Sequence, residues 1–518
     1  MSLSKPLLYL CLLLTSDFCS PSCWRAQSVA PAKRDDADFG GSPQALLIRS
    51  YIASRQLVPQ ERATALMLLA KSAATIEPAY SRLWSEELFY SAQQLPRDWN
   101  RLTFEKNGVQ ILAMTDPVRA FQLFAQLEDP IPMSSGRLPE DVRAFAARTV
   151  FPAYWRAKGP DAFDEIRSQS QHLGQTGQYP YAAIEPVVLD LAHSGDTRSV
   201  VMLNDAIGYF SRGSRFESAN SEFVELLTGV WEEIPAPLKH QALDVAVAQL
   251  SQPTRNADQI FQGSATSKSR TVEFTDENKQ LLFQLLPQIR EIDPKWADQL
   301  AEKDQQLGAA LGPSNGATTQ ISSGAIMNAS SASPAQVADA KSRLAQYGIL
   351  ARVEQEAPTD SNLALKDAQS LTDPALRSRA FAEIAAVLAA SDPSKASLVL
   401  NQTNVKLEDI QNSPEKVSAL FSKAKAAYAL HDQPSVQATW IRALDLGAEL
   451  FQEDLEIHPE MQAYQASCFN ELMDGVKFGA NADSLVTLAA LRTLQNQLLQ
   501  TYLPISAAEG IYESIRKK

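Results

Sequence analysis

Cysteine is scarce in this chain of 518 residues, which contains only Cys11, Cys19, Cys23 and Cys468. The first three lie close to the amino terminus, so the body of the chain has a single thiol and cannot form an internal disulfide framework. Small secreted domains usually depend on such frameworks, and this sequence excludes that solution. The folded chain must therefore be stabilised by side-chain packing.

Basic residues and glycine are also in short supply. The sequence has 47 Lys and Arg against 60 Asp and Glu, for a net charge of −13, and it contains no basic run longer than the final Arg-Lys-Lys. A nucleic-acid-binding protein needs a basic face, so this class is excluded. With 21 glycines, the sequence has neither GxGxxG nor GxxxxGK[ST], the loops that bring backbone N–H groups to phosphate. No cofactor-binding residue is predicted.

The amino-terminal residues have the pattern of an export signal. Lys5 precedes the apolar run Leu7–Leu14, and Ala26 is the expected cleavage point, which predicts a signal peptide over 1–26. The apolar run is far shorter than the ~20 residues that span a bilayer. We therefore expect an exported protein, periplasmic or extracellular, with no transmembrane segment after cleavage. Lipid anchoring at Cys19 or Cys23 is disfavoured because neither follows the short motif such processing requires.

Prolines divide the remaining chain at intervals of about twenty residues. Ser, Thr, Asp and Asn cap helices well, and proline at the next position loses no hydrogen bond because its N–H would be unpaired. Apolar residues then recur at helical spacing, as in Val417, Leu420, Phe421 and Ala424. These patterns predict short helices, with starts at four cap–proline pairs: Asp116 and Pro117, Asp373 and Pro374, Asp392 and Pro393, and Ser413 and Pro414.

Composition divides the chain into two helical blocks. Residues 27–42 have few large apolar side chains and predict a disordered leader, followed by block 1 over 43–305. Residues 306–333 are rich in small and polar residues and predict a flexible linker before block 2, over 334–518. A polar stretch at Gln252–Thr271 predicts a long exposed loop. No segment shows convincing strand alternation, so we expect an all-α fold.

The repeated helix starts resemble an α-solenoid of the tetratricopeptide or HEAT kind, with a unit of about 40 residues. The tripeptides that begin at Arg119, Arg143 and Arg379 all read Arg-Ala-Phe and suggest related units. Glu86–Phe124 is similar to uncharacterised exported helical proteins of acidobacteria, a resemblance that implies no activity. The solenoid resemblance implies a right-handed stack of antiparallel helix pairs whose concave face binds a protein or peptide partner.

Residues with catalytic or metal-binding chemistry are few and isolated. No two of the five histidines are three or four residues apart, which excludes a zinc site of the HExxH type. His458 lies among acidic residues but is better explained as part of a helix end, as is His193 before Gly195. Cys468 falls on an apolar stripe and is expected to be an inert core thiol. No catalytic or metal-ligating residue is predicted.

One alternative is left open by the aromatic residues around Glu86 and Glu87. Carboxylates beside Trp84 would suit an α/α-toroid enzyme that acts on envelope or plant polysaccharide, in which two acids converge on the sugar. Adjacent residues on a helix diverge by ~100°, however, so Glu86 and Glu87 cannot both face one substrate. The favoured hypothesis is therefore a non-catalytic exported scaffold, with the toroid enzyme as its alternative.

Overall fold

The computed structural model describes residues 41–128, 142–213, 216, 218–252, 259–267, 270–274, 276–303, 307, 320–328, 334–402 and 407–517. The predicted signal peptide, all but the end of the predicted leader, and Cys19 and Cys23 lie outside these residues. Residues 41–518 form one compact unit, and the description below concerns this unit alone.

Block 1 is mostly helical, with three-residue and four-residue 3₁₀ turns between some of its helices. Its helices and turns are α2 (Pro43–Ser54), α3 (Pro59–Ile76), α4 (Pro78–Ala92), α5 (Trp99–Ala113), α6 (Pro117–Phe124), α7 (Val142–Lys158), η1 (Gly159–Ala162), α8 (Phe163–Gln175), α9 (Tyr181–His193), α10 (Arg198–Ser211), α11 (Ala219–Gly229), η2 (Trp231–Glu233), α12 (Ala236–Leu250), α13 (Glu277–Ile292) and α14 (Pro294–Lys303).

The regular elements described in block 2 are all helices. Its elements are α16 (Pro334–Glu356), α17 (Ser361–Ser370), α18 (Pro374–Leu388), α19 (Pro393–Asn401), η3 (Leu407–Asp409), α20 (Pro414–Ala429), α21 (Gln433–Ile457), η4 (Ala463–Gln465), α22 (Phe469–Ala482), α23 (Ser484–Thr493) and α24 (Gln497–Arg516). The prediction of a mainly α-helical protein is thus confirmed.

Side-chain caps at the proline positions show why the helices begin where they do. Asp373 accepts hydrogen bonds from the N–H groups of Ala375 and Leu376 at 2.8 and 2.9 Å. The side chains of Asp116, Asp392 and Ser413 likewise accept a backbone N–H three residues on, at 3.1, 2.9 and 3.2 Å. In each case the next residue is the proline that begins the helix. Such a cap stabilises a helix by about 1 kcal/mol.

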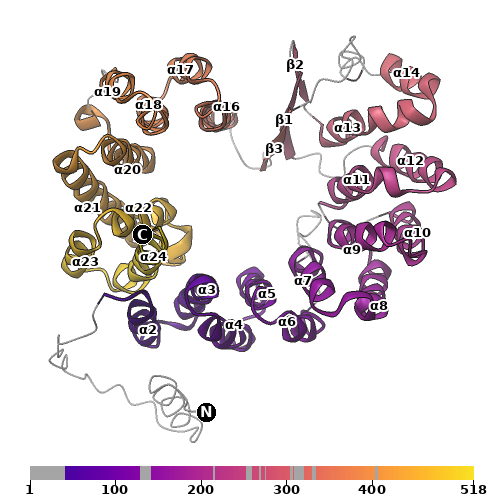
Figure 1. Cartoon of the computed structure of the whole chain (residues 1–518), viewed down its shortest axis with the longest axis horizontal. Coiled ribbons are helices and arrows are strands. Elements are labelled where there is room, and N and C mark those ends of the chain that lie inside the picture. Colours follow the sequence, from indigo (N-terminus) through magenta and orange to yellow (C-terminus); the bar gives the residue numbers. More distant parts are fainter. Residues whose placement is uncertain are drawn as a thin grey trace, which may run out of the picture. The chain divides into compact units, whose positions relative to one another are not determined.

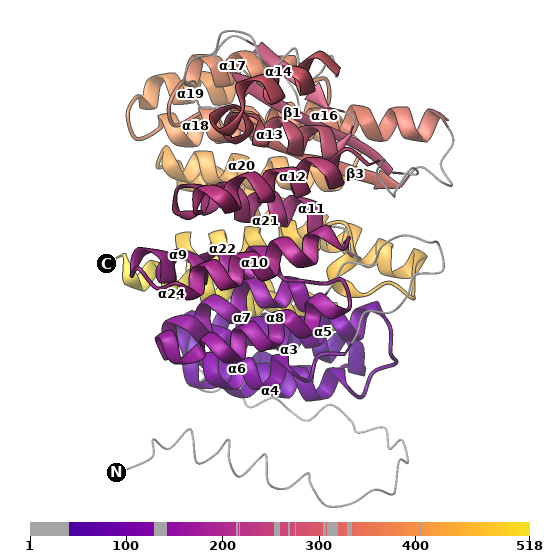
Figure 2. The ribbon, with the colours of Figure 1, turned by 90° about the vertical axis from the view of Figure 1, so that its right-hand side faces the viewer.

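Alternate helices contact one another and form a row that we call the continuous row. It consists of α3, α5, α7, α9, α11 and α13 in block 1 and α16, α18, α20, α22 and α24 in block 2. The intervening helices pack against members of this row. Figure 1 shows the continuous row on the inner side of residues 41–517. In Figure 2 the axes of many of these helices run roughly along the same line, whichever way the chain passes through them. The exposed side of this row is therefore a surface to which many helices contribute.

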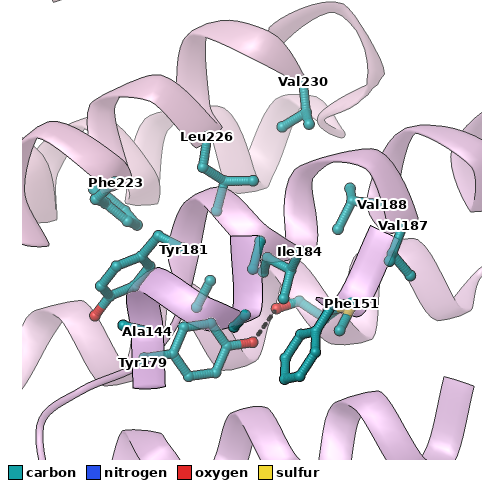
Figure 3. Packing of buried hydrophobic residues seen from close by; sticks show 14 of the residues in the cluster. Ala144, Phe151, Tyr179, Tyr181, Ile184, Val187, Val188, Phe223, Leu226 and Val230 are labelled. Atoms are coloured by element: carbon teal, nitrogen blue, oxygen red, sulfur yellow. Dashed lines mark hydrogen bonds between the residues drawn. The ribbon is translucent and has the colours of Figure 1, made fainter. Parts of the chain in front are cut away.

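The core lies between the continuous row and the helices that pack on it. In block 1 the ring of Phe223 stacks on that of Phe210 with centroids 3.8 Å apart, and Tyr181 meets both rings edge-on. Figure 3 shows aliphatic residues of α9 and α11, such as Ile184 and Leu226, filling the space beside these rings. Each buried side chain of this size contributes roughly 1.5–3 kcal/mol. This packing takes the place of the disulfides that the sequence lacks.

Three strands depart from the expected all-α fold. β1 (Gln259–Ser267) pairs antiparallel with β2 (Arg270–Phe274) on one side and with β3 (Gln320–Asn328) on the other. The sheet packs on α13, where the buried ring of Phe274 lies 5.4 Å from that of Phe283. Residues 259–267 and 270–271 of the predicted exposed loop at Gln252–Thr271, and residues 320–328 of the predicted linker at 306–333, are thus strands, contrary to expectation. Both stretches lack hydrophobic alternation, and backbone pairing does not require it.

The two blocks are joined by packing as well as by the chain. The last helix, α24, contacts α2 and α3, the first helices of block 1. Tyr502 on α24 donates a hydrogen bond to the carboxylate of Glu61 on α3, and the N–H of Ala463 donates to the same carboxylate at 3.0 Å. Ser72 on α3 donates to Glu509 on α24 at 2.5 Å. We call this contact the seam. The sequence predicted only a flexible link between the blocks.

Candidate functional site

Glu86 and Glu87, the carboxylates of the alternative enzyme hypothesis, have different ion-pair partners. Glu86 accepts a hydrogen bond from Arg119 Nη2 at 3.1 Å. Glu87 accepts one from Arg62 Nη2 at 2.6 Å and another from the Tyr51 hydroxyl at 2.9 Å. These contacts tie α4 to α6 and to α2 and α3, respectively. The two carboxylates therefore do not converge. Their adjacent positions on one helix had predicted this divergence.

Trp84, the aromatic residue beside these carboxylates, belongs to the core. Its side chain is 1% exposed, and its ring stacks on that of Tyr51 with centroids 5.3 Å apart. The ring of Tyr80 lies 5.2 Å away on the same helix. A sugar platform would need an exposed ring face, so Trp84 does not supply one.

Cys468 is a buried thiol immediately before α22 and has no exposed surface. Burial, followed by the charge of Glu471, raises its pKa to about 12. A thiol is a weak nucleophile because only the thiolate attacks, and this thiol stays protonated near neutral pH. Cys468 itself is the residue before α22 begins, so it lies at the end of the apolar stripe predicted from the sequence and not within the helix.

The two histidines considered as functional candidates lie at helix ends. His193 is the last residue of α9, and its Nε2 lies 3.3 Å from a carboxylate oxygen of Glu233. His458 caps the end of α21, with Nδ1 3.6 Å from Glu460. Among the described residues, no group of three or more His, Cys, Asp or Glu side chains is arranged to hold a metal ion.

The exposed side of the continuous row instead presents an aromatic residue beside two cations. Phe145 on α7 is 38% exposed, and Lys106 Nζ on α5 lies 4.4 Å from its ring centroid. Arg148 Cζ lies 5.7 Å from the same centroid. Gln110 on α5 donates to the Phe145 carbonyl oxygen at 3.2 Å and to Thr149 Oγ1 at 3.3 Å. We call these five residues the Phe145 cluster. The two cations are attracted electrostatically to the face of the Phe145 ring.

A second cluster on the continuous row carries the opposite charge. Tyr347 on α16 is 42% exposed and donates a hydrogen bond to Glu415 Oε1 on α20 at 3.1 Å. Burial, followed by the charge of Glu415, raises the pKa of Tyr347 to about 12. Burial also raises the pKa of Glu471 on α22, against the opposing charge of Arg379 on α18. We call Tyr347, Arg379, Glu415 and Glu471 the Tyr347 cluster.

Neither cluster was predicted from the sequence, although Phe145 belongs to one of the Arg-Ala-Phe tripeptides. Phe121 and Phe381, the last residues of the other two Arg-Ala-Phe tripeptides, are 8% and 5% exposed and belong to the core. Phe145 faces solvent, whereas Arg143 is buried. The tripeptide at Arg143 therefore presents its phenylalanine to solvent, whereas the other two present theirs to the core. An aromatic residue out of phase with its helix's buried stripe was the signal available in the sequence.

Comparisons with known proteins identified no relative from which a function could be inferred, so the two clusters are the features that bear on function. No protein-family model matches the chain, and neither curated proteins nor solved structures gave a match. Within the described residues, no helix is both long and apolar enough to cross a membrane.

Proposed function

We propose that this chain is a non-catalytic helical-repeat scaffold that binds a protein or peptide partner on the exposed side of the continuous row. The supporting observation is the exposure of aromatic side chains on that row, Phe145 and Tyr347, each beside charged groups. Exposed aromatic residues with charged neighbours are typical of the residues that dominate binding energy at interfaces. The proposal includes stacking as a right-handed solenoid.

Charge on the two clusters would select the partner's orientation. The Phe145 cluster offers Lys106 and Arg148, although Arg148 also lies 3.2 Å from the buried carboxylate of Glu222. The Tyr347 cluster offers Glu415 and Glu471. A partner with acidic groups facing the first cluster and basic groups facing the second would be complementary to both. Binding of this kind weakens as salt screens exposed charges.

Site-specific photo-crosslinking tests this proposal. A photoreactive phenylalanine analogue at Phe145 should capture the same partner as one at Tyr347. The matched control is Val201 on α10, outside the continuous row, since it is 37% exposed against 38% for Phe145. Capture that is equal at all three positions, or absent at Phe145 and Tyr347, would reject the proposed surface.

We further propose that the protein is exported. The proposal depends on the signal-peptide pattern of residues 1–26. Mass spectrometry of the protein secreted by a bacterial host should show a new amino terminus near Ala26. A cytoplasmic product that retains Met1 would contradict it.

The Tyr347 cluster is also the one observation that favours the alternative enzyme. Glu415 and Glu471 lie in the first turns of neighbouring helices of the row, and the raised pKa of Glu471 is a property of general acids. Loss of polysaccharide hydrolysis in Glu471→Gln, with Glu87→Gln unaffected, would support an enzyme. If the wild-type protein turns over no polysaccharide, the scaffold remains the better hypothesis.

A further inference from the structure

A cleft lies mainly on α21, a helix outside the continuous row, and is lined by charges of both signs. Its volume is about 340 Å³, which is near the lower end of the range for small-ligand sites. Six lining residues come from one face of α21, and two come from the turn that precedes α20 and from its first turn: Ala438, Ile441, Arg442, Asp445, Leu446, Glu449, Asn412 and Lys416.

The cations of this cleft have hydrogen-bonding capacity to spare. Lys416 is 4% exposed, and its Nζ donates to the Ile410 carbonyl oxygen at 2.7 Å and to Asn412 Oδ1 at 3.1 Å. An ammonium group has three donors, so a further N–H remains beyond these two bonds. Arg442 Nη1 donates to Glu408 Oε1 at 2.5 Å, which uses one of the five guanidinium donors. Burial of an ammonium without an anionic partner is costly, and an anion in the cleft would offset that cost.

The carboxylates of the cleft are not neutralised by these cations. Asp445 and Glu449 are exposed, lie four residues apart on α21, and have no ion-pair partner within 4.0 Å in the described part of the chain. Like charges at this spacing destabilise a helix slightly, so a bound cation would relieve the repulsion. Lys416 and Arg442 line the same cleft, yet neither pairs with these two carboxylates.

The apolar part of the lining limits the chemistry of the occupant further. Ile441 is 40% exposed, and it lies between Ala438 and Leu446 on the same face of α21. A free inorganic ion would leave this surface in water. A short peptide has apolar side chains, backbone groups that Asn412 can bond, and charges of both signs, and so matches every component of the lining.

We propose that this cleft binds the carboxyl-terminal end of a peptide that also carries a basic side chain. Lys416 and Arg442 bond the terminal carboxylate, Asp445 and Glu449 bond the basic side chain, and Ile441 contacts an apolar side chain. This site adjoins the Tyr347 cluster on α20 but is formed by different residues, and neither proposal depends on the other.

Fluorescence polarisation with three labelled peptides tests the site in the full chain. The reference probe is fluorescein-Gly-Gly-Lys-Ala-Leu with a free carboxylate; the second ends in an amide, and the third has norleucine in place of lysine. The reference probe should bind saturably with a dissociation constant below about 1 mM at low salt. Each altered probe should bind at least about fivefold more weakly, because one set of charged contacts is lost.

Variants of exposed lining residues then assign each contact. Arg442→Gln should abolish the preference for the free carboxylate, and Asp445→Asn with Glu449→Gln should abolish the preference for lysine over norleucine. Glu453→Gln is the control, since it lies on α21 outside the lining. Equal binding of the three probes, no saturable binding of the reference probe, or the same loss in the control would overturn the proposal. Circular dichroism checks that each variant is folded.

Discussion

The seam between the two blocks makes a strong prediction about Tyr502. Its ring is fully buried in α24, and its hydroxyl donates to the carboxylate of Glu61 on α3, itself only 8% exposed. Burial, followed by the charge of Glu61, raises the pKa of Tyr502 well above its usual value, so the hydroxyl keeps its proton. Tyr502→Phe removes this donor while leaving the ring's packing in place.

The expected loss follows from what remains around Glu61. A hydrogen bond to a charged group contributes about 1.5–3 kcal/mol, and a buried acceptor left short of partners adds to the cost. The Ala463 N–H still donates to the carboxylate of Glu61 at 3.0 Å, so this buried acceptor keeps one of its hydrogen bonds and the loss of stability is smaller. We therefore expect the seam to lose about 2 kcal/mol, which corresponds to about a 30-fold change in an opening equilibrium.

Hydrogen exchange measures this loss at the helices concerned. Amide protons of α24 and of the first turns of α3 should exchange about 30-fold faster in Tyr502→Phe than in the wild-type chain. Tyr428→Phe is the matched control, because this tyrosine is 40% exposed and lies on α20, away from the seam. Unchanged protection of α24, or equal effects of the two variants, would refute the role assigned to the Tyr502 hydroxyl.

Three further predictions concern other parts of the structure. Asp373→Ala should lower the free energy of unfolding of α18 by about 1 kcal/mol through loss of the cap, measured by urea denaturation; no change would contradict the cap. Burial raises the pKa of Glu105 above 4.5, so its favourable contribution is complete below that pH and is lost as pH rises through the raised native value. The free energy of unfolding of Glu105→Gln relative to wild type should therefore increase with pH from 4.5 upward and then level off; a pH-independent difference would contradict this. Finally, a protease site inserted within 308–319 should yield two pieces that co-elute in gel filtration, because the seam and the β1–β3 pairing join them; separate elution would show that these contacts are too weak.

The seam also bears on how the chain is assembled. The first and last helices of residues 41–517 pack on each other. Helices that belong to different blocks along the chain are therefore neighbours in the packed structure. The loop before α22 adds to this contact, since the Tyr464 hydroxyl donates to Asn100 Oδ1 on α5 at 3.1 Å. Stability of the first helices should therefore depend on the last ones.

Local rules made much of the helical structure predictable from sequence. A cap and a proline act within one turn of helix. Helix starts could therefore be predicted without reference to the rest of the chain at Asp116, Asp373, Asp392 and Ser413. Buried stripes were readable for the same reason, because helical periodicity is a property of neighbouring residues. The divergence of Glu86 and Glu87 also followed from local geometry, although their distant partners did not.

Contacts between distant residues could be decided only by the tertiary structure. The pairing of β1 with β3, the bond from Tyr502 to Glu61, and the meeting of Tyr347 with Glu415 join residues separated by dozens to hundreds of positions, and no local pattern encodes them. The exposure of Phe145 depends likewise on which neighbours α7 acquires. Sequence determined where the helices begin and which faces they bury, whereas the surface available to a partner was decided by how those helices meet, because exposure is a property of the packed assembly.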